Sequence, residues 1–221
     1  MPLPKTKQRT LAAGEARLAV WNNRSPRMST RAASVTLVPR LGVLADAALV
    51  VAGTGLVAIA AQISFSLPFT PVPITGQTFA VVLVGASLGT IRGFASLLLY
   101  LWLGVAGAPI YADRAHGWSV VTSASGGYIV GFVVAAAVTG FLAERRWDRR
   151  LSSSIGSMLT GNVIIYLVGL PWLAVVLHTN LEKTLEYGLY PFVPGDIFKL
   201  YLAAALLPGA WRIVERIKRS S

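Results

Sequence analysis

Two ionisable residues lie close together at the start of the last hydrophobic segment of this chain. Asp196 and Lys199 follow Pro194 and Gly195 and are three residues apart, so on a helix their side chains would share one face. The start of a helix favours an anion such as Asp196. Lys199 needs another explanation, because a charge inside an apolar helix is costly unless it is paired or binds a ligand. The pair therefore indicates a structural ion pair or a ligand-binding site.

A donor beside an acceptor suits certain ligands. The carbonyl of a neutral cyclic urea or amide needs a donor, and its N–H needs an oxygen. Lys199 alone would also suit a carboxylate. The two residues by themselves leave both ligand types open.

A proline-rich stretch supplies the next candidates. Pro68, Pro71 and Pro73 lie within six residues of one another, and prolines at this spacing disfavour a helix. Such a segment runs outside the membrane or lines a cavity, so we expect a lid there. Gln77 and Thr78 follow at the start of the next apolar run, where an amide and a hydroxyl can bind a ligand without carrying a charge.

Aromatic residues, glycines and an amide complete the set of candidates. Tyr111 lies in a polar connection that leads to Gly126, Gly127 and Tyr128. Paired glycines at a helix start allow close approach of another helix or of a ligand, and we keep both uses open. Asn162 interrupts an apolar run, where it would bond across a helix bundle or contact a ligand.

The composition indicates the elements that must position these residues. The chain has 221 residues, 54% hydrophobic and only 13% charged, with a mean hydropathy of +0.62, which is too apolar for an ordinary soluble domain. Because about 20 residues cross a bilayer, we predict an all-α membrane protein with a bundle of six transmembrane helices. The six predicted spans are 43–66, 76–91, 92–110, 126–143, 155–177 and 196–214.

The basic residues predict a topology. The net charge of +11 would fit a nucleic-acid partner, but nearly all lysines and arginines fall before residue 43, in the loop 144–150 and in the last ten residues. By the positive-inside rule these segments are cytoplasmic. Both termini are therefore predicted to be cytoplasmic, the connections 66–76, 108–125 and 178–195 face outward, and no nucleic-acid partner is expected.

Several kinds of chemistry are excluded or disfavoured. The chain has no cysteine, which excludes disulfides, thiol nucleophiles and cysteine metal sites. His116 and His178 both fall in predicted loops, no carboxylate pair lies inside a span, and no GxxxxGK[ST] motif occurs. We therefore expect no metal site, no catalytic residues and no ATP hydrolysis by this chain.

The two ends of the chain differ in character. Residues 1–40 are polar and arginine-rich, which predicts a disordered cytoplasmic tail, although translation could also start at Met28. Residues 41–221 form the predicted membrane domain. In its first span Ala48 and Ala52 have the small-xxx-small spacing that allows close helix contact, either inside the bundle or with a separate membrane subunit.

Four ordered stretches carry a family resemblance. PVPITGQTFAVVLVG, RGFASLLLYLWLGVAGAPIYA, SGGYIVGF and PFVPGDIFKLYLAAAL resemble the BioY family, the substrate-binding S components of biotin transporters of the energy-coupling-factor (ECF) type. The likeness covers about residues 43–214. It implies a six-helix protein of the plasma membrane that binds biotin from outside and delivers it with a transmembrane coupling subunit and ATP-binding subunits. Such a protein is not an enzyme and has no cofactor, and biotin is its transported ligand.

The resemblance also assigns residues. The acid and lysine of the family motif PGDxxK look like Asp196 and Lys199, and its proline-rich loop and glutamine look like the segment ending at Gln77. The family's Gly-Gly-Tyr looks like Gly126, Gly127 and Tyr128. If the chain binds a coupling subunit as the resemblance implies, the small-residue surface at Ala48 and Ala52 is the expected interface.

Two departures from the family pattern leave some contacts open. Many members have Gly-Pro-Thr where this chain has Ser123, Ala124 and Ser125, and the second outer connection carries the charged stretch ADRAHGW.

Two other functions are the alternatives to biotin uptake. The chain could be an S component for another vitamin or a membrane-embedded enzyme.

Overall fold

The computed structural model describes residues 42–220. The predicted tail 1–40 and the alternative start at Met28 lie outside these residues. The division of the chain into a tail and a membrane domain therefore stays a prediction.

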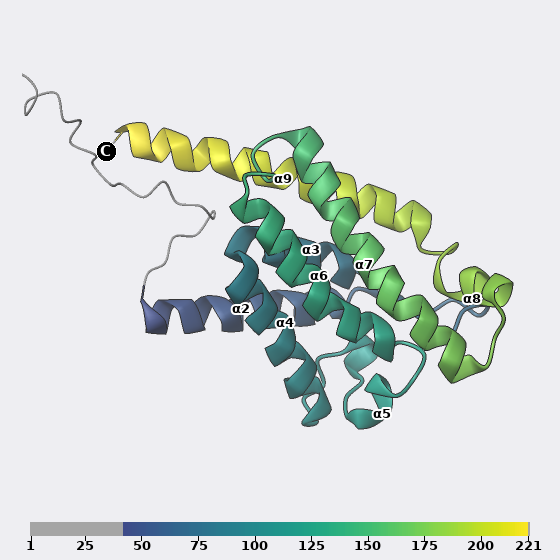
Figure 1. Cartoon of the computed structure of the whole chain (residues 1–221). Helices are drawn as coiled ribbons and strands as arrows, with labels where there is room; N and C mark the ends of the chain where they lie inside the picture. Colours follow the sequence, from purple (N-terminus) through teal and green to yellow (C-terminus); the bar gives the residue numbers. More distant parts are fainter. Residues whose placement is uncertain (1–41, 221) are drawn as a thin grey trace, which may run out of the picture. The chain divides into compact units, whose positions relative to one another are not determined.

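Each predicted span overlaps one main helix of the structure, and Figure 1 shows these helices. The chain is mostly helical, in agreement with the predicted all-α class. These helices are α2 (Val43–Ala61), α3 (Gln77–Leu88), α4 (Thr90–Val105), α6 (Gly126–Glu144), α7 (Leu151–Leu177) and α9 (Val193–Ser220).

Short elements connect the main helices. The strands β1 (Ser64–Phe65) and β2 (Ile74–Thr75) form an antiparallel ribbon in which Ser64 pairs with Thr75. A 3-10 turn, η1 (Ala112–Arg114), and the helices α5 (Trp118–Val121) and α8 (Leu181–Gly188) lie in the later connections.

The lengths of the helices support several membrane crossings. Within the described residues, α2, α6 and α7 are long and apolar enough to cross a bilayer, and α8 with α9 makes a fourth candidate that is bent by 52°. The helices α3 and α4 have 12 and 16 residues, fewer than the roughly 20 that a straight crossing needs. Six complete crossings and the side on which the termini lie therefore stay predictions.

The predicted boundary between the second and third spans was wrong by a few residues. The helix break lies at Gly89, whose φ of 85° stops α3 because this backbone conformation suits glycine and few other residues. Arg92 lies inside α4 and forms an ion pair with Asp46 of α2 at 2.6 Å. Arg92 therefore holds α2 and α4 together.

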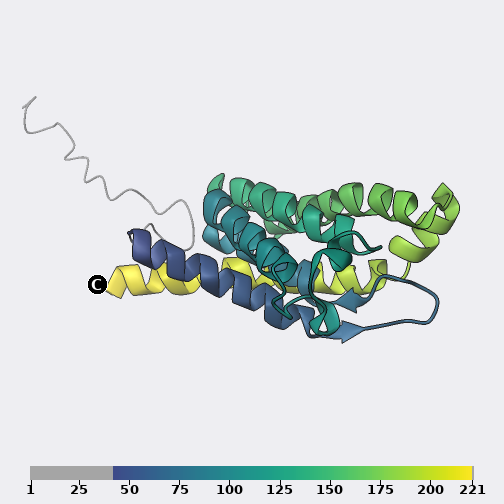
Figure 2. The same cartoon turned by 90° about the horizontal axis from the view of Figure 1, so that it is seen from below.

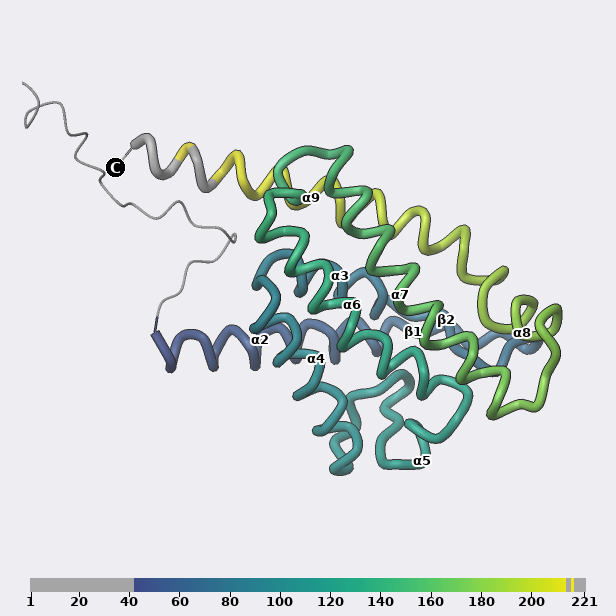
Figure 3. Tube along the Cα trace, in the orientation of Figure 1, coloured from purple at the N-terminus to yellow at the C-terminus, as the bar shows by residue number. Residues whose placement is uncertain are grey.

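The helix α6 lies in the middle of the bundle. It packs against α3, α4 and α7, while α2 packs on α4 and α3, and α9 packs on α7 and α3. Between α4 and α6 the chain passes through α5, which the trace in Figure 3 follows.

Three connections meet at one end of the bundle, which we call the loop end: segments 62–76, 106–125 and 178–192. Gln62 Nε2 donates to the backbone oxygen of Tyr111 at 3.0 Å. Thr70 Oγ1 donates to the backbone oxygen of Tyr187 at 2.6 Å, and Figure 2 shows the proline-rich loop between the strands extending toward α8. The predicted lid is thus attached to both other connections.

The glycine pair at the start of α6 allows close packing. A Cβ added to Gly127 would lie 2.2 Å from Trp172 Cβ of α7, and one added to Gly126 would lie 1.7 Å from the backbone oxygen of Val121. Of the two uses that the sequence left open, the structure shows contact with another helix for both glycines, α7 for Gly127 and α5 for Gly126.

Gly127→Ala should lower the free energy of unfolding by about 1–3 kcal/mol, because overpacking forces α6 and α7 apart. Gly55→Ala is the matched control, since a Cβ at Gly55 meets nothing within 4 Å. Thermal unfolding of the detergent-purified variants measures both. Equal stability of the two variants would contradict this role for Gly127.

Candidate functional site

A cavity of about 350 Å³ lies at the loop end, in the size range of small-molecule pockets. Its walls come from the ribbon and its loop, from the connection 106–125, and from α3, α6, α7 and α9. The lining residues run from Ser66 to Lys199 along the chain. The cavity therefore exists only when these distant segments have packed into the bundle.

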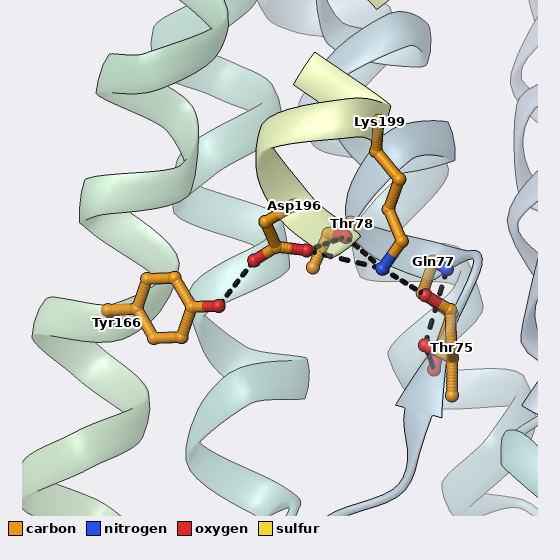
Figure 4. Close-up of polar contacts among 6 residues, drawn as sticks. All are labelled: Thr75, Gln77, Thr78, Tyr166, Asp196 and Lys199. Atoms are coloured by element: carbon orange, nitrogen blue, oxygen red, sulfur yellow. Dashed lines mark hydrogen bonds and ion pairs between the residues drawn. The ribbon is translucent and has the colours of Figure 1, made fainter. Parts of the chain in front are cut away.

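One wall carries the Asp196–Lys199 pair, drawn in Figure 4. Asp196 lies in the first turn of α9 and is only 5% exposed. Its Oδ1 lies 3.2 Å from Lys199 Nζ. The ammonium also donates to the backbone oxygen of Thr75 at 2.7 Å and more weakly to Thr78 Oγ1 at 3.4 Å. Lys199 therefore connects α9 to the ribbon and to α3.

Two hydroxyl groups stabilise the buried carboxylate. Thr78 Oγ1 donates to Asp196 Oδ1 at 3.1 Å, and the Tyr166 hydroxyl donates to Asp196 Oδ2. Hydrogen bonds to the charged form offset part of the cost of removing a carboxylate from water. Asp196 is therefore held in one position by α3, α7 and its own helix.

Gln77 belongs to an adjoining network. Its Nε2 donates to the Tyr100 hydroxyl at 2.7 Å, and its Oε1 accepts from Thr75 Oγ1 at 2.9 Å. Both ends of the amide are thus oriented, with the side chain almost fully buried. Gln77 fixes the base of the lid against α4.

The tyrosines of the site stabilise its loops. Tyr111 is buried against Gly104 of α4 and donates to the backbone oxygen of Leu101 at 2.7 Å. Burial raises the pKa of the Tyr111 hydroxyl to about 12, so the group stays protonated and keeps its donor. Tyr128 donates to the backbone oxygen of Gly188 at 2.9 Å, which ties α6 to α8.

The rest of the wall is largely apolar. Such a lining excludes water and strengthens the few polar contacts inside it. The buried apolar lining residues are Val72, Ile129, Phe132, Ile165 and Phe192.

The structure brings five of the seven predicted ligand-contacting residues to the cavity. Gly127 and Asn162 are not among the residues that line it. Gly127 packs on Trp172, and Asn162 is buried in α7, where its Oδ1 has no hydrogen-bond partner among the described residues. The five that do line the cavity are Gln77, Tyr111, Tyr128, Asp196 and Lys199.

Two contributors to the site were missed in the sequence. Tyr166 lies four residues after Asn162, so its hydroxyl in an apolar run was a detectable signal, but its contact with Asp196 was not. Thr75 contributes its backbone oxygen, which has no sequence signature. Within residues 42–220, no group of three potential metal ligands occurs.

Comparison with known proteins gives a consistent result. The family model described as BioY family matches residues 28–216. A biotin transporter BioY of Rhizobium etli is 34% identical over 158 residues, which cover 68% of this chain and 84% of the relative. A biotin transporter BioY of Thermotoga maritima is 36% identical over 153 residues, 69% of this chain and 88% of the relative. These relatives are named as transporters and not as enzymes.

A solved structure has the same fold. It is described as the S-component for biotin from an ECF-type ABC transporter, and it superposes with a TM-score of 0.70. The match covers 76% of this chain and 92% of the other chain at 24% sequence identity. At that identity the likeness concerns the fold alone.

Tyr166→Phe should lower the free energy of unfolding by about 1–3 kcal/mol, because it leaves a buried carboxylate oxygen without its donor. Tyr201→Phe is the control, since Tyr201 lies exposed on α9. Thermal or denaturant unfolding in detergent compares the two variants. If Tyr166→Phe were as stable as Tyr201→Phe, the hydroxyl would not support Asp196.

Proposed function

Since the chain belongs to the BioY family, we propose that it is the substrate-binding S component of an ECF-type transporter and binds biotin from outside the cell. The observation that carries this proposal is the cavity with an ammonium beside a carboxylate, in a family whose curated relatives are named biotin transporters. The chain is a multi-pass membrane protein, and we place it in the plasma membrane with six crossings and both termini in the cytoplasm.

The hydrogen-bonding capacity of the pair supports biotin as the ligand. Three of the four acceptor positions of the Asp196 carboxylate are taken by Lys199, Thr78 and Tyr166, so one remains for an N–H. The Lys199 ammonium has three donors, and its 3.4 Å contact with Thr78 is the weakest. A ureido ring can take that donor with its carbonyl and offer its N–H to Asp196.

The remaining walls suit the rest of the molecule. The thiolane ring and the aliphatic chain of biotin are apolar, and their burial against Phe132, Ile165 and Phe192 would stabilise the complex by about 25 cal/mol per Å² of apolar surface. The buried pair gives orientation and the apolar wall gives most of the contact area.

ATP hydrolysis belongs to partner subunits in this proposal. The chain itself has no phosphate-binding motif of the GxxxxGK[ST] type. A transmembrane coupling subunit would bind the bundle, and reorientation of the bundle against that subunit would open the cavity toward the cytoplasm.

The surface of α2 supports a docking site for the coupling subunit. Ala48 and Ala52 are exposed there, and Ala52 borders an apolar groove of about 340 Å³ between α2, α3 and α9. Small residues beside an apolar groove allow close approach of a partner helix. The Arg92–Asp46 ion pair holds the first turn of α2 in place.

Biotin should bind the purified wild-type chain, and Lys199→Ala and Asp196→Ala should each weaken binding by about 30-fold or more, since removal of one partner leaves a buried charge unpaired. Lys183→Ala and Glu186→Ala are matched controls, because these residues form an exposed ion pair outside the cavity. Equilibrium binding in detergent measures all five proteins. A folded wild type that fails to bind biotin would point to another vitamin.

Ala48→Trp and Ala52→Trp should leave biotin binding intact and abolish co-purification with the coupling subunit, because the indole ring would keep the two helices apart. Val163→Trp is the control, since Val163 is exposed on α7, away from the groove. Normal co-purification of both alanine variants would exclude this surface as the interface.

A further inference from the structure

The cavity has a buried end and an open end. Among its lining residues only Ser66, Pro71 and Asp113 are exposed, so these three mark the opening. Asp196, in contrast, is buried with only 5% of its surface exposed. A ligand whose polar ring binds Asp196 and Lys199 therefore directs its other end toward Asp113.

Asp113 is held at the opening by the fold. Its φ of 55° is left-handed, a conformation that aspartate tolerates better than most residues. Its Oδ2 accepts from Ser64 Oγ at 3.3 Å and more weakly from Ser66 Oγ at 3.5 Å. The carboxylate is thus attached to the first strand of the ribbon.

Asp113 at the opening and Lys199 of the buried pair each contact a different strand of the ribbon. Ser64, which contacts Asp113, pairs across the ribbon with Thr75, which contacts Lys199. A path of two hydrogen bonds, one strand spacing and the atoms of Ser64 and Thr75 joins the carboxylate to the ammonium, so the two groups lie at most on the order of 15 Å apart. A small ligand with a ring and a chain can span that separation.

No described cation forms an ion pair with Asp113. The neighbouring Arg114 is exposed and does not line the cavity, and the ion pairs of the described residues nearest the loop end join Lys199 to Asp196 and Lys183 to Glu186. The carboxylate of Asp113 therefore adds a negative charge to the lining at the opening and has no ion-pair partner among the described residues.

We propose that Asp113 is a specificity-determining residue that selects ligands by the charge of their chain end. The proposal rests on the proposed function, with the ureido ring at the buried pair. The carboxylate end of biotin then meets a like charge, whereas a biotin amide with a neutral or cationic end does not. The site accordingly favours amide-linked biotin derivatives that end in an amine.

The expected effect is modest because the opening is hydrated. Two unit charges several Å apart in water interact by a fraction of a kcal/mol to about 1 kcal/mol. Loss of the Asp113 charge should therefore change the affinity of each charged ligand roughly threefold. The ratio between an anionic and a cationic ligand should then change about tenfold. Salt should weaken the effect, because exposed charges are screened.

Asp113→Asn is the informative variant. Asparagine also tolerates the left-handed backbone and keeps an oxygen for Ser64 and Ser66, so only the charge is lost. Glu186→Gln is the matched control, because it changes the net charge equally but does not line the cavity. Equilibrium binding is measured for biotin, biotinamide and N-(2-aminoethyl)biotinamide at low salt and at 0.5 M NaCl.

In Asp113→Asn we expect biotin to bind about threefold more tightly and the aminoethyl amide about threefold more weakly, with biotinamide unchanged. Glu186→Gln should keep the wild-type ratio of dissociation constants. If all three ligands bound with the same ratios of dissociation constants in wild type and in Asp113→Asn, the role of Asp113 would be overturned and the proposed function would stand. The same would follow if Glu186→Gln changed the ratio as much. Failure of the wild type to bind any of the three would overturn the proposed function as well.

Discussion

The contact between Lys199 and the backbone of the ribbon is the interaction on which the rest of the site depends. A buried ammonium must be satisfied by oxygen atoms, and here they come from Asp196 of its own helix, from Thr78 of α3 and from the carbonyl of Thr75. The same contacts close one side of the cavity and hold the base of the lid. In the proposed function, ligand binding and closure of the lid would therefore use the same charged group, which would couple the two events.

Close helix packing gives this polar network a rigid frame. Gly127 lets α6 approach Trp172, and Gly85 and Gly140 allow equally close contacts of α3 with α6 and of α6 with the α3–α4 junction. Because such contacts bring backbones together, small shifts of one helix move its neighbours. The loops are attached to this bundle by the hydroxyl groups of Tyr111 and Tyr128, which donate to the backbone oxygens of Leu101 and Gly188.

Much of this arrangement could be predicted from the chain. The six apolar segments and the pair Asp196 and Lys199 were detectable because hydropathy and i,i+3 spacing are local properties. The non-helical loop at Pro68, Pro71 and Pro73 was detectable because prolines constrain their own backbone. Asn162 and Gly127 were candidates for ligand contact or for helix packing, and neither lines the cavity, while Gly127 packs on Trp172. A polar or small residue in an apolar run has the same appearance in both roles, so sequence alone could not separate them.

The sequence by itself determined the class of the protein, the six main helical segments, and the charged pair that we propose binds the ligand, since each of these follows from residue types within one segment. Only the tertiary structure decided which groups complete the site. Tyr166, the carbonyl of Thr75 and the carboxylate of Asp113 lie far from Asp196 along the chain, and their positions relative to the cavity depend on how separate helices and loops pack. That packing is set by the free energy of many contacts between residues distant in the sequence, and a local pattern of residues carries no information about those contacts.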